Sequence, residues 1–246
     1  MKFFSCYNRN GDFMRICLIG GGNTRENENK NINKYIVNLA NKEKPNIIYF
    51  ALASKDSKDN IDAFINAFKD LANIRVFKDD FKESCSWADI IYFGGGNTSL
   101  IIDFINKNNL KDELVNVIRD KIYVGISAGA ICLFDKYLSD QNVFNLGNGN
   151  FNFLLKDGLG IIKGYCCPHY NESGKEIFFD LIDEDNIGLA IDNNVCVSFD
   201  ENGFSVVKDK KVNDAYFIYQ NVLYSFSDEK NYALINNNFG KLIALK

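Results

Sequence analysis

One serine of this chain stands between two glycines at the end of an apolar segment. Residues 122–130 read IYVGISAGA, which contains the pattern G-x-S-x-G. Such a pattern, after a β-prone run and before a helix, predicts a sharp strand-to-helix turn that presents a nucleophile, here Ser127. Gly125 and Gly129 carry no Cβ atom to obstruct the crossing of strand and helix. We expect the N–H of Ala128, at the start of the helix, to stabilise a developing oxyanion.

The chain has a single histidine, His169, within the sequence CCPHYN over residues 166–171. A serine hydroxyl is a poor nucleophile until a base takes its proton, and the pKa of histidine suits that task. Any Ser–His mechanism here must therefore use His169. A carboxylate should orient its imidazole. We favour Asp140, which lies between Ser127 and His169 in the chain, with Asp135 and Asp192 as alternatives.

A second glycine-rich turn, residues 94–96, follows the apolar run Asp89–Phe93. The carboxyl ends of parallel strands converge, so this turn should reach the same site. We expect Gly95 to give a second N–H to the oxyanion. Asn97 either binds substrate or caps the next helix. Nucleotide binding is the competing use of this turn and of the triglycine at 20–22, but the chain contains neither G-x-G-x-x-G nor G-K-[ST] at these turns.

The elements that must position these residues alternate between strand and helix in the first two-thirds of the chain. Strands are predicted at Arg15–Ile19, Asn46–Leu52, Ile74–Phe77, Asp89–Phe93 and Ile122–Ile126, and helices at 30–43, Lys58–Leu71, from Leu100 onward and at Ala130–Tyr137. This alternation predicts an α/β fold with a mainly parallel sheet and helices on both faces.

Short β-prone segments dominate after about residue 140. They lie at Gly160–Lys163, Gly188–Asp192, Val195–Phe199, Phe204–Val207, Ala215–Tyr219 and Val222–Phe226, with one predicted helix at Glu172–Ile182. We expect mostly antiparallel strands that extend the same sheet. The 246 residues are interpreted as a single α/β domain, in which residues 1–13 form an extension outside the fold and Met14 is a second candidate start.

Composition narrows the classes of function. The net charge of −4 argues against binding along a nucleic-acid backbone, which needs a basic face. No segment approaches the roughly 20 apolar residues of a membrane span. The seven cysteines show no C-x-x-C spacing, which indicates a reducing, cytoplasmic location without a disulfide framework or metal site.

Three motifs together resemble peptidase family S51, which contains aspartyl dipeptidase (peptidase E) and cyanophycinase. They are GGGNT at 94–98, GISAGA at 125–130 and PHY at 168–170, within a resemblance spanning roughly residues 15–200. The resemblance implies a fold similar to class I glutamine amidotransferases and a serine peptidase without metal or cofactor. By this resemblance Ser127 is the nucleophile, His169 the base and Asp140 the acid, and Gly95 and Ala128 form the oxyanion site.

The sequence departs from the family pattern at the residue expected to bind the substrate carboxylate. Family members selecting an N-terminal aspartate are expected to hold its carboxylate with an arginine after the histidine, but Arg119 is the last arginine here, and only lysines such as Lys175 follow His169. Glu172 and Glu176 either hold a substrate amine or form the acidic first turn of a helix.

The leading hypothesis is a dipeptidase or exopeptidase acting on short peptides through an acyl-enzyme. The alternatives are an esterase or amidase on the same triad and a non-catalytic binding module. We expect a short peptide as the only partner besides a second copy of the chain, with monomer or homodimer left open.

Overall fold

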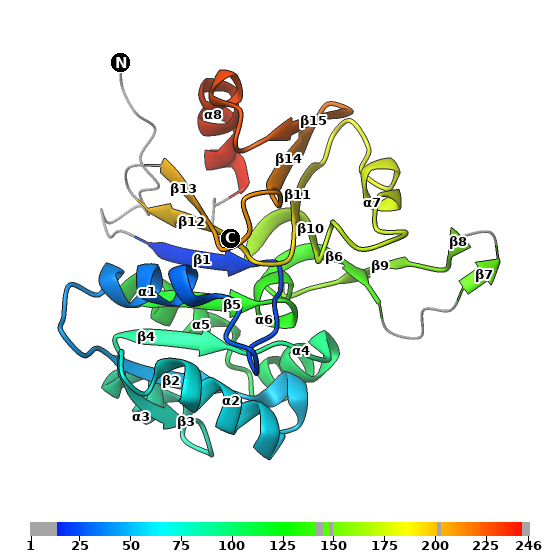
Figure 1. Cartoon of the computed structure of the whole chain (residues 1–246). Coiled ribbons are helices and arrows are strands. Elements are labelled where there is room, and N and C mark those ends of the chain that lie inside the picture. Colours follow the sequence, from blue (N-terminus) through cyan, green and yellow to red (C-terminus); the bar gives the residue numbers. More distant parts are fainter. Residues whose placement is uncertain (1–13, 141–144, 148–149, 201–202, 243–246) are drawn as a thin grey trace.

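The computed structural model describes residues 14–140, 145–147, 150–200 and 203–242. The expected extension at 1–13 lies outside these residues. Two mixed sheets form the centre of the molecule, and helices cover the larger of them on both sides (Figure 1). None of the described helices is both long enough and apolar enough to cross a membrane.

The larger sheet contains seven strands in the order β13-β12-β1-β5-β4-β2-β3. They are β1 (Arg15–Ile19), β2 (Asn46–Phe50), β3 (Asn73–Val76), β4 (Ile90–Phe93), β5 (Ile122–Ile126), β12 (Val195–Asp200) and β13 (Gly203–Lys208). The first five are parallel, while β12 and β13 add an antiparallel edge beside β1. Because β1, β5 and β4 are neighbours, the three glycine-rich turns that follow them meet at one edge of the sheet.

Helices cover both faces of this sheet because the apolar side chains of its strands point alternately to one face and to the other. On β5, Val124 joins the cluster under α1 (Lys30–Leu39) and α2 (Lys58–Phe68), whereas Tyr123 joins the cluster on the other face. That second cluster takes in α3 (Phe81–Trp87), α4 (Thr98–Lys107), α5 (Lys111–Asp120) and α6 (Ala128–Ile131). The predicted α/β core with helices on both faces is confirmed.

A second, six-stranded sheet has the order β15-β14-β11-β10-β6-β9. Its strands are β6 (Phe134–Ser139), β9 (Leu154–Asp157), β10 (Ile162–Pro168), β11 (Ile187–Ile191), β14 (Ala215–Tyr219) and β15 (Val222–Ser225). The prediction that the C-terminal strands extend one sheet is therefore wrong for all but β12 and β13. The sequence could not reveal this, because a strand buried on both faces, such as β11, looks the same in either sheet.

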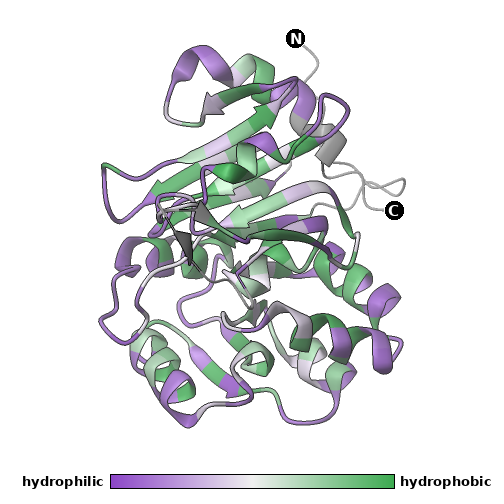
Figure 2. Ribbon diagram, turned by 90° about the vertical axis from the view of Figure 1, so that its right-hand side faces the viewer, coloured by the Kyte–Doolittle hydropathy of each residue, from purple (hydrophilic) through white to green (hydrophobic). Residues whose placement is uncertain are grey.

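The remaining elements are short or peripheral. They are the small hairpin β7 (Asn145–Gly147) and β8 (Asn150–Phe151), the helix α7 (Ile177–Asp180), the C-terminal helix α8 (Tyr232–Leu242) and two 3₁₀ turns at Leu52–Ser54 and Glu229–Asn231. Figure 2 shows hydrophobic residues gathered in the central strands and hydrophilic residues on the loops and outer helices. The fold thus buries its apolar surface between and around the two sheets.

Two predicted helices are wrong in extent. The helix after Ser127 ends at Ile131, and residues 134–139 form β6 instead of its continuation. The apolar residues of this segment are spaced as on one face of a helix, which led to the helix prediction. In the structure the segment is an inner strand that pairs with β10 on one side and β9 on the other. The helix predicted at 172–182 shrinks to α7, since Gly174 adopts a left-handed φ of +84° that interrupts it.

Candidate active site

Ser127 occupies a strained turn between β5 and α6. Its φ of 50° and ψ of −112° are unusual for a residue with a side chain, and its N–H donates to the carbonyl of Ile19 at 2.9 Å. Two close approaches require the flanking glycines. A Cβ on Gly125 would lie 2.2 Å from the carbonyl oxygen of Gly129, and a Cβ on Gly129 would lie 2.2 Å from that of Phe93. This is the geometry of a nucleophile elbow.

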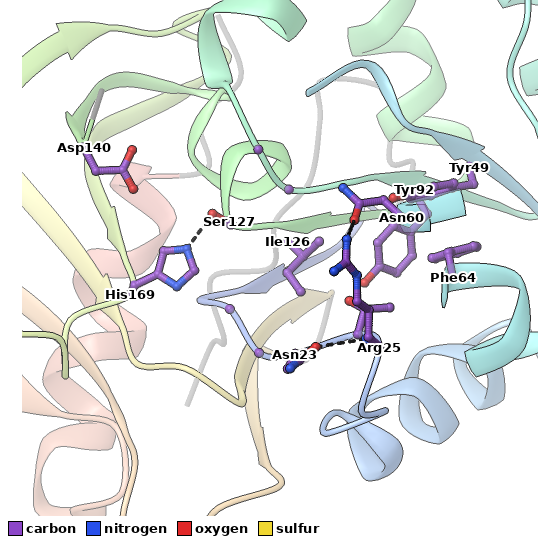
Figure 3. Close-up of a pocket in the computed structure, with 15 residues that line it drawn as sticks. Asn23, Arg25, Tyr49, Asn60, Phe64, Tyr92, Ile126, Ser127, Asp140 and His169 are labelled. Carbon is purple, nitrogen blue, oxygen red and sulfur yellow. Dashed lines mark hydrogen bonds between the residues drawn. The ribbon is translucent and has the colours of Figure 1, made fainter. Parts of the chain in front are cut away.

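His169 lies immediately after β10 and faces the serine. Its Nε2 atom is 2.6 Å from the Oγ atom of Ser127 (Figure 3). The φ of His169 is +124°, a conformation held by the carbonyl of Ile191, which accepts hydrogen bonds from the N–H groups of His169 and Tyr170 at 3.2 Å each. The two residues predicted from sequence to react together therefore lie within hydrogen-bonding reach.

The other ring nitrogen of His169 contacts an amide. Its Nδ1 atom lies 2.8 Å from the Oδ1 atom of Asn193, in the turn between β11 and β12. The amide orientation follows from its surroundings, because the Asn193 Nδ2 atom faces two acceptors, Glu172 Oε1 at 2.9 Å and Asn171 Oδ1 at 3.4 Å. Asn193 Oδ1 then accepts a hydrogen bond from the N–H at Nδ1, which leaves Nε2 free to accept a hydrogen bond from the hydroxyl of Ser127.

The pKa of His169 is lowered from its usual value of 6.5. Burial is the main cause, and the positive charge of Lys175 adds to it. The hydrogen bond with Asn193 and the charges of Glu172 and Asp140 act in the opposite direction. The imidazole is therefore kept neutral at physiological pH, which is the form that can act as a base.

The three predicted acids lie in different places, and the structure gives the Nδ1 atom of His169 an amide partner rather than any of them. Asp140 lines the pocket beside His169, 3.9 Å from the Nζ atom of Lys175. Asp135, on β6 and not on a helix, accepts from the N–H of Gly164 at 3.1 Å. Asp192 is buried, and its Oδ2 atom accepts from the N–H of Asp214 at 2.8 Å.

The residues predicted to form an oxyanion site lie on two converging turns. A Cβ on Gly95 would sit 3.3 Å from the Cβ of Ser127, so the turn after β4 touches the elbow. Within the described residues, the backbone N–H groups of Gly95 and Ala128 donate no hydrogen bond to the protein. Asn97 instead caps α4, where its Oδ1 atom accepts from the N–H of Ser99 at 2.9 Å, and it is not among the residues lining the pocket.

The triglycine at 20–22 packs against His169 and its partner Asn193. A Cβ on Gly21 would lie 2.1 Å from Asn193 Oδ1 and 2.3 Å from His169 Nδ1. The carbonyl of Gly21 also accepts from the N–H of Asn194 at 3.0 Å. A bare backbone at this position thus lets the turn after β1 press against the His169–Asn193 pair.

A pocket of about 480 Å³ opens in front of Ser127. Beyond the glycine-rich turns and Ser127 it is lined by Asn23, Thr24, Arg25, Tyr49, Asn60, Phe64, Tyr92, Ile126, Asp140 and His169. Figure 3 shows Asp140 and Arg25 on opposite sides of Ser127. Among the described residues, the guanidinium of Arg25 has long polar contacts, 3.5 Å to Asn60 Oδ1 and 3.8 Å to Asp59 Oδ2.

Sequence reasoning missed Asn193 and Arg25. Asn193 directly follows the predicted strand that ends at Asp192. A polar residue just after a strand is a signal that could have identified it as a candidate site residue. Arg25 follows the first glycine-rich turn, and a single arginine after such a turn matches no motif that would single it out. Among the described residues, no group of three or more histidine, cysteine, aspartate or glutamate side chains could hold a metal ion.

Comparisons with known proteins identify the family of this chain. The model of peptidase family S51 matches residues 16–207. The uncharacterized peptidase YgaJ of Bacillus subtilis (strain 168) is 31% identical over 196 residues, which cover 75% of this chain and 82% of that protein.

Two solved structures share the fold. The first is a peptidase from an acI-B1 Actinobacterium, with a TM-score of 0.62 at 19% identity, covering 89% of this chain and 96% of the other. The second is a putative peptidase E protein from Listeria monocytogenes EGD-e, with a TM-score of 0.58 at 15% identity, covering 80% of this chain and 98% of the other. The extent of the family match and the similarity to YgaJ establish that the chain belongs to peptidase family S51 and is a serine peptidase.

Proposed function

We propose that the protein hydrolyses short peptides through an acyl-enzyme formed on Ser127, as a dipeptidase or exopeptidase. The observation that carries this proposal is the 2.6 Å contact between Ser127 Oγ and His169 Nε2 at the floor of a pocket. A serine in hydrogen-bond contact with a neutral, partly buried imidazole is the arrangement that generates an alkoxide nucleophile.

The reaction proceeds in two halves. As Ser127 Oγ bonds to the substrate carbonyl carbon, its proton passes to His169 Nε2. The carbonyl oxygen becomes negative and accepts hydrogen bonds from the N–H groups of Gly95 and Ala128. When the C–N bond breaks, the proton on Nε2 passes to the leaving amine. Water then attacks the ester, His169 takes one of its protons, and Ser127 regains the hydroxyl as the acid product leaves.

The pocket supports a short substrate with charged ends. Its volume of about 480 Å³ suits a few residues rather than a folded protein. Asp140 and Arg25 give it opposite charges on the two sides of Ser127 (Figure 3). A peptide with free termini carries an ammonium and a carboxylate, and Arg25 supplies the forked donor set that suits a carboxylate.

A dipeptide library incubated with purified protein tests this proposal. We expect release of free amino acids from a subset of dipeptides by the wild-type chain and none by the Ser127→Ala variant. Hydrolysis of p-nitrophenyl esters without cleavage of any peptide would favour an esterase on the same residues. Equal peptide cleavage by Ser127→Ala and wild type would remove Ser127 from the mechanism.

A further inference from the structure

The turn that carries His169 also carries a carboxylate behind it. The N–H of Glu172 donates to the carbonyl of His169 at 3.0 Å, which closes a tight turn between the two residues. This turn places Glu172 Oε1 at 2.9 Å from Asn193 Nδ2 and 3.6 Å from His169 Nδ1. Glu172 is not among the residues lining the pocket, and its carboxylate lies at the Nδ1 side of the imidazole, whereas Ser127 lies at the Nε2 side.

Hydrogen bonds of its backbone and its side chain hold Asn193 between His169 and Glu172. Its N–H donates to Asn171 Oδ1 at 3.0 Å, and its carbonyl accepts from Asn213 Nδ2 at 2.6 Å. Its side chain bonds His169 on one side and Glu172 on the other. The described contacts therefore form one continuous line: Ser127, His169, Asn193 and Glu172.

We propose that Glu172 supplies the negative charge in this series of hydrogen-bonded residues and acts on His169 through the side-chain amide of Asn193. This inference rests on the proposed Ser127–His169 mechanism. Both Asn193 and Glu172 are positioning residues, since neither touches the substrate. No proton leaves Nδ1 at any step: the only proton that moves on the imidazole is the one at Nε2.

The physical reason is the charge that appears on the imidazole during the reaction. When Nε2 takes the serine proton, the ring becomes a cation in a partly buried site, which is costly without a negative group nearby. A neutral amide offers only a dipole. A carboxylate that accepts a hydrogen bond from the amide Nδ2 polarises it and makes Oδ1 a stronger acceptor. Glu172 thus supplies the negative charge that Asn193 lacks.

Other charges act on the same ring. Asp140, at the pocket side, shares the sign of Glu172, while the cation of Lys175 opposes both. Glu172 differs from these two because its effect passes through a hydrogen-bonded amide on the ring nitrogen that faces away from Ser127. Replacing that amide by a carboxylate should therefore make Glu172 dispensable, whereas a structural role for Glu172 would not depend on residue 193.

The experiment is a double-mutant cycle of Glu172→Gln and Asn193→Asp, with Glu176→Gln as the matched control. Glu176 is an exposed acid on the same segment and is not among the residues lining the pocket, so the structure does not support the substrate-amine role considered for it from the sequence. Glutamine can still accept the hydrogen bond from Asn193, so this variant removes the charge alone. Two quantities are measured: kcat/KM against pH on a cleaved dipeptide, and the pKa of His169 by NMR. The single histidine gives one unambiguous imidazole signal, which reports without any substrate.

We expect Glu172→Gln to lower kcat/KM by about five- to tenfold, the effect of one partly exposed charge near the ring. The pKa of His169 should fall at the same time, because a negative charge that favoured the imidazolium is gone. Asn193→Asp should raise that pKa. In the Asn193→Asp background, Glu172→Gln should cause no loss, since the charge is delivered directly and repulsion between two carboxylates is relieved.

An unchanged pKa and rate in Glu172→Gln would overturn the inference. So would an equal loss of rate in both backgrounds, which would indicate a structural role. Failure of the wild type to hydrolyse any peptide would instead count against the proposed function, while the NMR titration would still report whether Glu172 and Asn193 act on His169.

Discussion

Lys175 stands against the turn that leads into His169: its Nζ atom donates to the carbonyl oxygen of Pro168 at 3.0 Å, although its side chain is almost fully buried. The ammonium therefore fixes the residue before His169 and places a positive charge near the imidazole. Asp140, 3.9 Å away, partly balances that charge. Lys175 therefore affects both the position of His169 and the pKa of its imidazole.

Replacing Lys175 by Met should shift the pH dependence of activity. Lys175 lowers the pKa of His169, so its removal should raise that pKa. The base works when neutral, and the acid limb of kcat/KM should therefore move to higher pH, with activity lost first in mildly acidic buffer. The lost hydrogen bond to Pro168 should also lower the free energy of unfolding by about 1–3 kcal/mol. A pH profile that keeps its acid limb, or moves it to lower pH, would contradict this account.

Arg25 should determine affinity for a substrate carboxylate. Removing its guanidinium in Arg25→Gln should raise KM by about tenfold for dipeptides with a free carboxylate, because a charge-assisted hydrogen bond is lost. C-terminally amidated dipeptides and dipeptides with an acidic side chain separate the two sources of that carboxylate. Lys58→Gln, at an exposed lysine paired with Asp62 outside the pocket, is the control. Equal KM changes for free and amidated peptides would exclude carboxylate binding by Arg25.

Gly21 should tolerate no side chain. In Gly21→Ala the new Cβ would meet Asn193 Oδ1 at 2.1 Å and His169 Nδ1 at 2.3 Å, so the His169–Asn193 pair must shift. A displacement of about 1 Å at a catalytic base lowers kcat by roughly a hundredfold. Circular dichroism should show a folded protein, which separates this effect from global unfolding. Wild-type kcat in a folded Gly21→Ala protein would mean that the pair is not pressed against this turn.

Local chemistry made the elbow at Ser127 and its contact with His169 predictable from the sequence. Gly125 is required by a backbone crossing within the elbow itself, where its Cβ would meet Gly129, and a chain with one histidine offers one candidate base. The parallel direction of β1, β5 and β4 was also implicit in the alternation of strands and helices, whereas their order in the sheet was not. These features depend on short segments or on composition, which a sequence displays directly.

The partner of His169 Nδ1 was not predictable in the same way. Asp140 looked suitable because it lies between the serine and the histidine in the chain, but β6 carries it to the pocket side of the ring. Asn193 reaches the ring because β11 and β12 belong to different sheets and the turn between them passes His169. That path depends on strand pairing between distant segments, and strand pairing is the information that residue patterns lack.

Covalent labelling tests the central claim most directly. A fluorophosphonate probe reacts with a serine whose hydroxyl is activated by a base, and peptide mass spectrometry locates the modified residue. We predict that the wild-type chain is labelled on Ser127 and that the folded His169→Ala variant, with the serine intact, is labelled at least about a hundredfold more slowly. Equal labelling rates in the two proteins, or a label on another residue, would contradict the pairing of Ser127 with His169.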